Sequence, residues 1–154
     1  MGGWLESLLP WGTEVIVYAQ SHSNEWLDSV FGFLTTLGYE EFYLVVLPLV
    51  YWCLNKRVGA GLAFISLFSA WLNSAIKYIF AIPRPDDPRI VPKAPRPETS
   101  PSFPSGHAQN AAVNWGYLAI HFRSWIFRVI AVILAVGIGL SRIGLGVHYP
   151  QDVI

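Results

Sequence analysis

The residues best suited to chemistry gather in one stretch, residues 141–152, which reads SRIGLGVHYPQD. It holds Arg142, His148 and Asp152 beside Pro150, a residue that can open a helix. The planar fork of an arginine can grip two oxygens of an oxyanion. A histidine can attack when one ring nitrogen is neutral, and a carboxylate on the other nitrogen fixes that state. If Pro150 is the first helical residue, Asp152 is the third and can reach back toward His148. The stretch therefore predicts chemistry on an anionic group.

Two earlier stretches add the donors that a phosphate group requires. KYIFAIPRP supplies Lys77 as a point charge and Arg84 as a second planar fork. Cations are costly to hold at a membrane interface, so three at one place indicate an anionic ligand. PSGH places Ser105 and Gly106 where the next helix begins. Serine is a good N-cap, glycine lets the backbone approach a ligand, and the N-terminus of a helix suits a phosphate.

These residues resemble the type 2 phosphatidic acid phosphatase family of membrane lipid phosphatases. The signatures of that family are KxxxxxxRP, PSGH and SRxxxxxHxxxD, and all eleven defined positions match here in order and spacing. The resemblance covers residues 24–154 and leaves residues 1–20 outside it. The family has a sixth helix, and we expect this chain to be truncated before that helix is complete.

The resemblance implies a role for each motif residue. His148 would attack phosphorus to give a phosphohistidine intermediate, with Asp152 fixing its tautomer. His107 would protonate the leaving oxygen and then activate water. The phosphate would be bound by Lys77, Arg84, Ser105, Gly106 and Arg142. No acidic cluster or Cys/His pair suggests a metal site, so we expect hydrolysis without a metal or other cofactor.

Membrane helices are the elements predicted to position these residues. The chain has 154 residues, is 53% hydrophobic and is only 13% charged, about half the charged share of a soluble domain. Seven Trp, seven Tyr and nine Phe are typical of membrane interfaces. The clearest span is 58–76, with 19 uncharged residues, and we expect Lys77 to end it. Helical spacing and stop signals predict further helices at 24–38, 40–54, 106–122 and 125–143, and Pro150 opens another.

We therefore predict an all-α fold, a polytopic membrane helical bundle of about five spans plus the start of a sixth. The segment 24–38 is short, and both a tilted span and a re-entrant segment stay open. Residues 1–22 form an N-terminal interfacial segment, and residues 23–154 form the transmembrane domain. We favour a helix on the membrane surface over a disordered leader for residues 4–20. The single cysteine, Cys53, excludes an intrachain disulfide and is expected to pack among apolar residues.

Residues 81–104 are predicted to form an irregular loop outside the hydrocarbon, because they hold eight of the eleven prolines. The flanking helices alternate in direction, so this loop and residues 141–152 lie on the same side of the membrane. When the three motif cations are left out, four basic residues lie on the side opposite the motifs and three lie on the motif side. That count does not decide which side faces the cytoplasm.

Other polar residues are interpreted more plainly. Asn110 and Asn114 share a helix face with the PSGH histidine and are expected to pair helices rather than to position that histidine. Asn73 leaves the same two interpretations open. Asp86 and Asp87 are expected to balance the neighbouring arginines rather than to act as acid and base.

The sequence therefore predicts a multi-pass membrane lipid phosphatase whose partners are membrane lipids and a lipid phosphate or diphosphate. The formal net charge of zero suggests no nucleic-acid partner, and the oligomeric state stays open. For a bacterial protein, the resemblance favours undecaprenyl diphosphate or a phospholipid phosphate, at an extracytoplasmic site of the plasma membrane. One alternative is a vanadium-dependent haloperoxidase, whose soluble relatives hold vanadate in a similar constellation. A second alternative is a non-catalytic membrane binding module.

Overall fold

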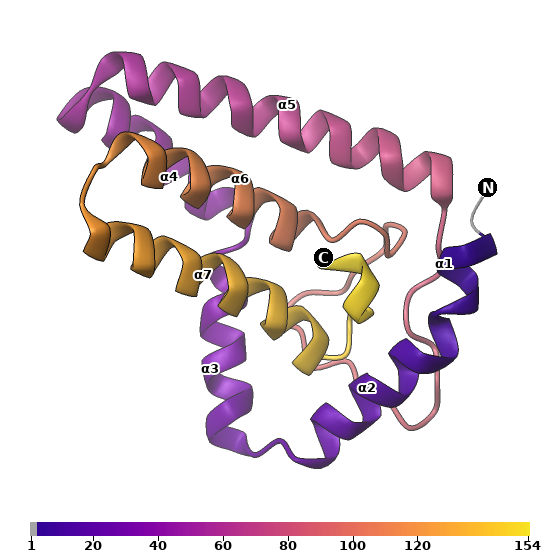
Figure 1. The fold of residues 1–154 in the computed structure, drawn as a ribbon. Helices are drawn as coiled ribbons and strands as arrows, with labels where there is room; N and C mark the ends of the chain where they lie inside the picture. Colours follow the sequence, from indigo (N-terminus) through magenta and orange to yellow (C-terminus); the bar gives the residue numbers. More distant parts are fainter. Residues whose placement is uncertain (1–2) are drawn as a thin grey trace.

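The computed structural model describes residues 3–154, and every regular element within them is helical (Figure 1). The elements in chain order are α1 (Gly3–Ser7), α2 (Leu9–Ser21), α3 (Glu25–Thr36), α4 (Glu40–Leu49), the π-helical turn η1 (Val50–Leu54), α5 (Lys56–Phe80), α6 (Gly106–His121), α7 (Trp125–Gly144) and the 3-10 turn η2 (Pro150–Asp152). The all-α prediction is therefore confirmed.

Three long helices that alternate in direction form the centre of the molecule (Figure 1). Helix α6 packs against α5 and α7, and α3 packs on α7. The three central helices, α5, α6 and α7, each begin at a side-chain cap. The caps are Asn55, Ser105 and Ser124, which accept backbone N–H groups of the first turn. The alternation places the end of α5, the start of α6 and the end of α7 at one end of the bundle. This is the end where the three motifs lie.

The helix of the span predicted at 58–76 does not end at Lys77, as we expected, because α5 continues to Phe80. A cation in the last turn of a helix is favoured by the helix dipole and does not stop the helix. The stop is Ala81, which adopts a left-handed φ of 48° and donates its N–H to the Lys77 carbonyl at 2.8 Å. The Lys77 side chain therefore projects from inside the last turn.

The outward faces of α5 and α7 are apolar and exposed, as lipid-facing surfaces are. Phe64, Leu67 and Trp71 lie on α5, while Val132 and Ile133 lie on α7. Within residues 3–154, α5 and α7 are long and apolar enough to cross a membrane, and α3 with α4 and η1 adds a third span if that bent pair counts as one. Helix α6 has 16 residues, fewer than the roughly 20 of a full span. The molecule is therefore built as a membrane protein, while the count of five spans stays a prediction.

The two helices predicted at 24–38 and 40–54 form a bent pair, with an angle of 54° at the break between Thr36 and Glu40. Pro48 lies inside α4, and the π-helical turn η1 follows directly. Cys53, in this turn, is exposed rather than packed as we expected.

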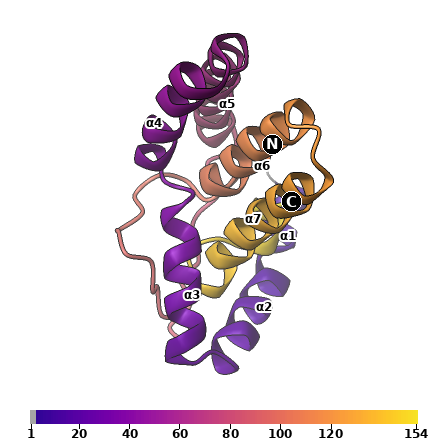
Figure 2. The same ribbon diagram turned by 90° about the vertical axis from the view of Figure 1, so that its left-hand side faces the viewer.

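Helices α1 and α2 lie across the motif end of the bundle (Figures 1 and 2). Helix α2 packs against α7 and η2, and its Ile16 joins a buried cluster with Ile90 and Tyr149. A helix is therefore present where the N-terminal segment was predicted, although residues 1–2 of that segment lie outside the described residues. Its position on a membrane surface stays a prediction.

Residues 81–104 form neither helix nor strand, as the prolines predicted. Ion pairs fasten this loop to three helices. The pairs are Arg89 with Glu14 of α2 at 2.7 Å, Lys93 with Asp28 of α3 at 2.7 Å, and Arg96 with Glu41 of α4 at 2.6 Å. The loop is thereby held across the end of the bundle.

Candidate active site

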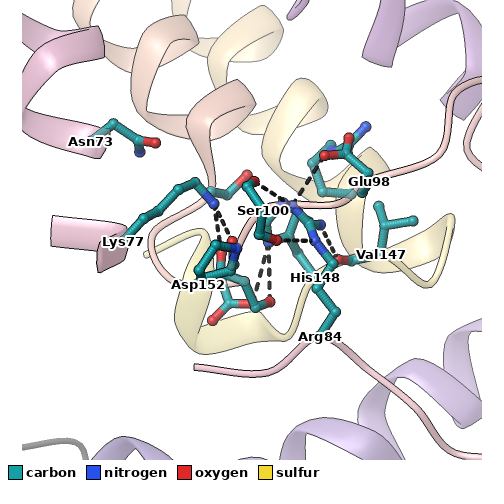
Figure 3. A network of polar contacts seen from close by, with 12 residues as sticks. Asn73, Lys77, Arg84, Glu98, Ser100, Val147, His148 and Asp152 are labelled. Atoms are coloured by element: carbon teal, nitrogen blue, oxygen red, sulfur yellow. Dashed lines mark hydrogen bonds and ion pairs between the residues drawn. The ribbon is translucent and has the colours of Figure 1, made fainter. Parts of the chain in front are cut away.

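The three motif stretches meet at a cavity of about 390 Å³ at this end of the bundle. Figure 3 shows Lys77, Arg84 and His148 close together there. Five of the eight predicted site residues line it, namely Lys77, Arg84, Gly106, His107 and His148. The other three, Ser105, Arg142 and Asp152, are buried and contact the lining residues or the start of α6. The structure therefore brings all eight into one region.

His148 is buried between a carboxylate and a guanidinium. Its Nδ1 lies 3.3 Å from Asp152 Oδ2, and its Nε2 lies 3.2 Å from Arg84 Nη1. These contacts fit a ring that carries its proton on Nδ1 and presents a lone pair at Nε2. Burial, with the nearby cations Arg84, Arg142 and Lys77, holds the pKa of His148 well below its ordinary value of 6.5. The ring is therefore neutral at physiological pH.

Asp152 is held by the turn in which it lies. The 3-10 turn η2 begins at Pro150, and the Tyr149 N–H donates to Asp152 Oδ2 at 2.8 Å. This confirms that the carboxylate reaches back across the turn toward His148. Burial raises the pKa of Asp152, while hydrogen bonds from Ser102 and the Tyr149 backbone oppose that rise.

Glu98 lies between the two arginines of the motifs. One of its oxygens is 3.0 Å from Arg84 Nη2, and the other pairs with Arg142 Nη2. The Arg142 side chain is fully buried, and its Nη1 donates to Thr35 Oγ1 at 2.5 Å. Arg84 therefore pairs with Glu98 and not, as expected, with the adjacent aspartates. Arg89 does pair with Asp87, at 3.0 Å.

Sequence reasoning missed Glu98, Thr35 and Ser102. Glu98 carried a usable signal, because it is the only acid between Asp87 and the PSGH motif. Thr35 lies in α3, more than 100 positions from its partner, and no local pattern relates the two. Ser102 looked like an ordinary loop serine.

Lys77 and the start of α6 complete the lining. Lys77 Nζ donates to the carbonyl of Pro101 and, at 3.4 Å, to that of Ser102. Ser105 caps α6 by accepting the Ala108 N–H at 3.4 Å, as predicted. A Cβ placed on Gly106 would meet only the Asn73 side chain, whose Oδ1 would lie 3.4 Å away. The first turn of α6 is therefore accessible from the cavity, with its free N–H groups and positive dipole end.

His107 lines the cavity with an unsatisfied nitrogen. Its Nε2 is buried and has no hydrogen-bond partner within the described part of the chain. Its ring packs edge-on against Tyr39, with the ring centroids 4.7 Å apart. A buried nitrogen without a partner, on a residue that lines the cavity, suits a group that exchanges a proton with a ligand.

The asparagines of α6 pair helices, as we favoured. Asn110 accepts a hydrogen bond from Ser69 at 3.1 Å, and Asn114 accepts one from Ser66. Asn73 donates to Gln109 at 2.9 Å and to the Pro104 carbonyl at 3.3 Å. Across residues 3–154, no three His, Cys, Asp or Glu side chains are grouped so that they could hold a metal ion. Independence from metal stays a prediction.

Known proteins resemble this chain in sequence. Residues 58–154 match the model of the PAP2 superfamily. A probable sphingosine-1-phosphate phosphatase of Dictyostelium discoideum is 28% identical over 91% of this chain and 37% of its own length. Glucose-6-phosphatase 3 of Homo sapiens is 30% identical over 90% of this chain and 48% of its own length. The chain thus spans less than half the length of these two relatives.

A crystal structure gives the same result for the fold. A transmembrane PAP2-type phosphatidylglycerolphosphate phosphatase from Bacillus subtilis superposes with a TM-score of 0.81 and 26% identity, over 96% of this chain and 77% of that one. The superfamily match covers more than half of the chain and includes all eight predicted site residues. By sequence and by fold, the chain belongs to the PAP2 superfamily.

Proposed function

We propose that this protein is a membrane-embedded lipid phosphatase that hydrolyses a phosphate or diphosphate monoester through a phosphohistidine intermediate. The observation that carries the proposal is a cavity lined by a neutral histidine, an arginine, a lysine and the start of a helix, with a second, buried arginine paired to the lining residue Glu98. Cationic forks, a point charge and helix N–H groups together match the oxygens of a phosphate group.

The first step is attack by His148. The phosphate group takes the place of the Glu98 carboxylate between Arg84 and Arg142, with Lys77 beside it. The Nε2 lone pair forms a bond to phosphorus while the bond from phosphorus to the ester oxygen breaks. His107, protonated at the start of this step, donates its proton to that leaving oxygen, so a monophosphate releases a neutral alcohol and a diphosphate releases the lipid monophosphate. Asp152 accepts the Nδ1 hydrogen bond and stabilises the positive charge that develops on the ring.

The second step regenerates the enzyme. His107, now without its proton, accepts one from a water molecule as that water attacks phosphorus. The bond between nitrogen and phosphorus breaks, inorganic phosphate leaves, and His148 is again neutral. The arginines and Lys77 stabilise the phosphoryl oxygens in both steps.

A lipid is favoured over a soluble ester by the surroundings of the cavity. Tyr78 and Ala70 line it from α5, and Tyr78 is 80% exposed beside the apolar outer face of that helix. A phosphate on a lipid tail can therefore enter while its tail stays in the membrane. The names of the relatives include lipid phosphates and one sugar phosphate, so a soluble substrate is a necessary comparison.

The test uses the purified full-length protein in detergent micelles. We expect release of inorganic phosphate from phosphatidate, sphingosine phosphate or an isoprenyl diphosphate in excess EDTA, and much slower release from glucose 6-phosphate. His148→Ala should lower kcat by at least about 1000-fold. Equal rates in the variant and the parent would overturn the mechanism, and faster hydrolysis of the sugar phosphate would overturn the lipid assignment. Bromide oxidation with added vanadate should stay at background. A rise above background would favour the haloperoxidase alternative.

A further inference from the structure

Ser102 is a buried serine in an exposed, proline-rich loop. Its side chain is fully shielded, with 0% relative exposure. It lies outside all three signature stretches, two positions before the PSGH motif. A hydroxyl buried this deeply must have hydrogen-bond partners, and in this protein those partners are the two residues at the centre of the site.

The Ser102 hydroxyl contacts the histidine and carboxylate pair directly. It donates a hydrogen bond to Asp152 Oδ2, and its oxygen lies 3.4 Å from His148 Nδ1. Asp152 Oδ2 thus receives the Ser102 hydroxyl, the Tyr149 N–H at 2.8 Å and His148 Nδ1 at 3.3 Å, whereas Oδ1 has no partner within residues 3–154. One oxygen of the carboxylate is therefore held from three directions.

The Ser102 backbone joins the remaining motif. Its N–H donates to the Ile82 carbonyl at 2.8 Å, just before Arg84, and its carbonyl accepts from Lys77 Nζ at 3.4 Å. Asp152 is joined to the same segment a second time, because the Ser105 N–H donates to the Asp152 carbonyl at 2.7 Å. Ser102 is therefore hydrogen-bonded to two of the motif stretches, residues 77–85 and residues 141–152, while the PSGH stretch is joined to the latter through Ser105.

We propose that Ser102 is a positioning residue whose hydroxyl orients the Asp152 carboxylate and keeps it ionised, so that His148 presents Nε2 to the phosphorus. This inference rests on the proposed phosphatase function. The hydroxyl lies on the Nδ1 side of the ring, away from the attacking nitrogen, and therefore acts through Asp152 rather than on the substrate. The Ser102 hydrogen bond also favours the charged form of Asp152 against the effect of burial.

The test separates the hydroxyl from the backbone, because an alanine keeps both backbone hydrogen bonds. In Ser102→Ala we expect kcat to fall about tenfold or more while the inhibition constant of inorganic phosphate changes less than about twofold, since the arginines and Lys77 are retained. Without its donor, Asp152 binds a proton more readily, so the acidic limb of the kcat/KM profile should move to higher pH. Ser102→Thr, which retains a hydroxyl, should recover most of the loss.

Ser69→Ala is the matched control. Ser69 is also a buried serine with a side-chain hydrogen bond, but it lies between α5 and α6, and it donates to Asn110. The Ser69→Ala change should leave the pH profile unmoved. A wild-type kcat and profile in Ser102→Ala would overturn the proposal, as would the same shift in Ser69→Ala. If the alanine variant fails to fold, Ser102→Cys replaces the hydroxyl with a somewhat larger group that is a much weaker donor, and a wild-type kcat and pH profile in that variant would also overturn the proposal. If the proposed phosphatase function itself is wrong, the parent protein will release no phosphate, and this result is distinct from any effect of the Ser102 variants.

Discussion

At the scale of single residues, the contact that sequence reasoning missed most clearly is Glu98 between two arginines. A phosphate can be gripped by Arg84 and Arg142 only after this carboxylate has moved away. We therefore expect Glu98→Gln to bind inorganic phosphate more tightly, with an inhibition constant lower by about tenfold, because a competing negative charge is removed from a partly desolvated site. Glu14→Gln removes the same charge from an exposed pair whose two residues do not line the cavity, and it should leave the constant unchanged. An unchanged or higher constant in Glu98→Gln would contradict the expectation.

The protonation of His148 gives a second prediction at this scale. Its pKa lies well below 6.5 because of burial and three cations, so the ring stays neutral as the pH falls through that value. The acidic limb of kcat/KM for a lipid phosphate, which belongs to the His148–Asp152 pair, should therefore lie below about pH 6.5. The same lowered pKa means that the unfolded chain binds a proton in this range and the folded chain does not, so stability should decrease as the pH falls below about 6.5. A limb above that value would show that His148 is not shielded as described.

At the scale of elements, hydrogen bonds among the side chains of Asn73, Ser69 and Gln109 join α5 to α6, and we call this row the polar seam. Gln109 is its central member, accepting from Asn73 at 2.9 Å and donating to the hydroxyl of Ser69 at 3.0 Å. Interhelical hydrogen bonds in membranes contribute roughly 0.6 to 1.7 kcal/mol. A double-mutant cycle with Asn73→Ala and Gln109→Ala, measured as unfolding free energy in detergent, should give a coupling in that range. Strictly additive effects would show that the seam does not couple the helices.

The helices were largely predictable from the sequence, and their ends were less so. Spans 106–122 and 125–143 differ from α6 and α7 by one residue each, because Ser105 and Ser124 are caps that can be recognised locally. Lys77 was misjudged because its charge favours a helix end without causing it. The pairing of Arg142 with Thr35 and Glu98 could not be predicted, because it depends on how α3 and the loop pack onto α7.

At the scale of the whole molecule, the motifs predicted the chemistry and the composition predicted the membrane, but the charge count left the sidedness open. The structure gives a physical reason to leave three more basic residues out of that count. Arg89, Lys93 and Arg96 fasten the loop to α2, α3 and α4, so the fold itself accounts for their presence at the motif end. The basic residues at the other end lie in or beside the turns before α5 and α7. No ion pair within residues 3–154 involves them, and Arg128 alone donates a side-chain hydrogen bond, to the Ala119 carbonyl at 3.2 Å. We therefore propose that those turns face the cytoplasm and that the cavity faces away from it.

This orientation can be measured with single cysteines. The only native cysteine is Cys53, so a Cys53→Ser background allows each end to be labelled alone. Thr99→Cys places an exposed thiol in the loop, and Arg123→Cys places one in the turn between α6 and α7 at the opposite end. A membrane-impermeant maleimide added to intact cells should label Thr99→Cys and should label Arg123→Cys only after the cells are broken. The reverse pattern would place the cavity in the cytoplasm, and its lipid substrate would then have to be presented from the inner leaflet.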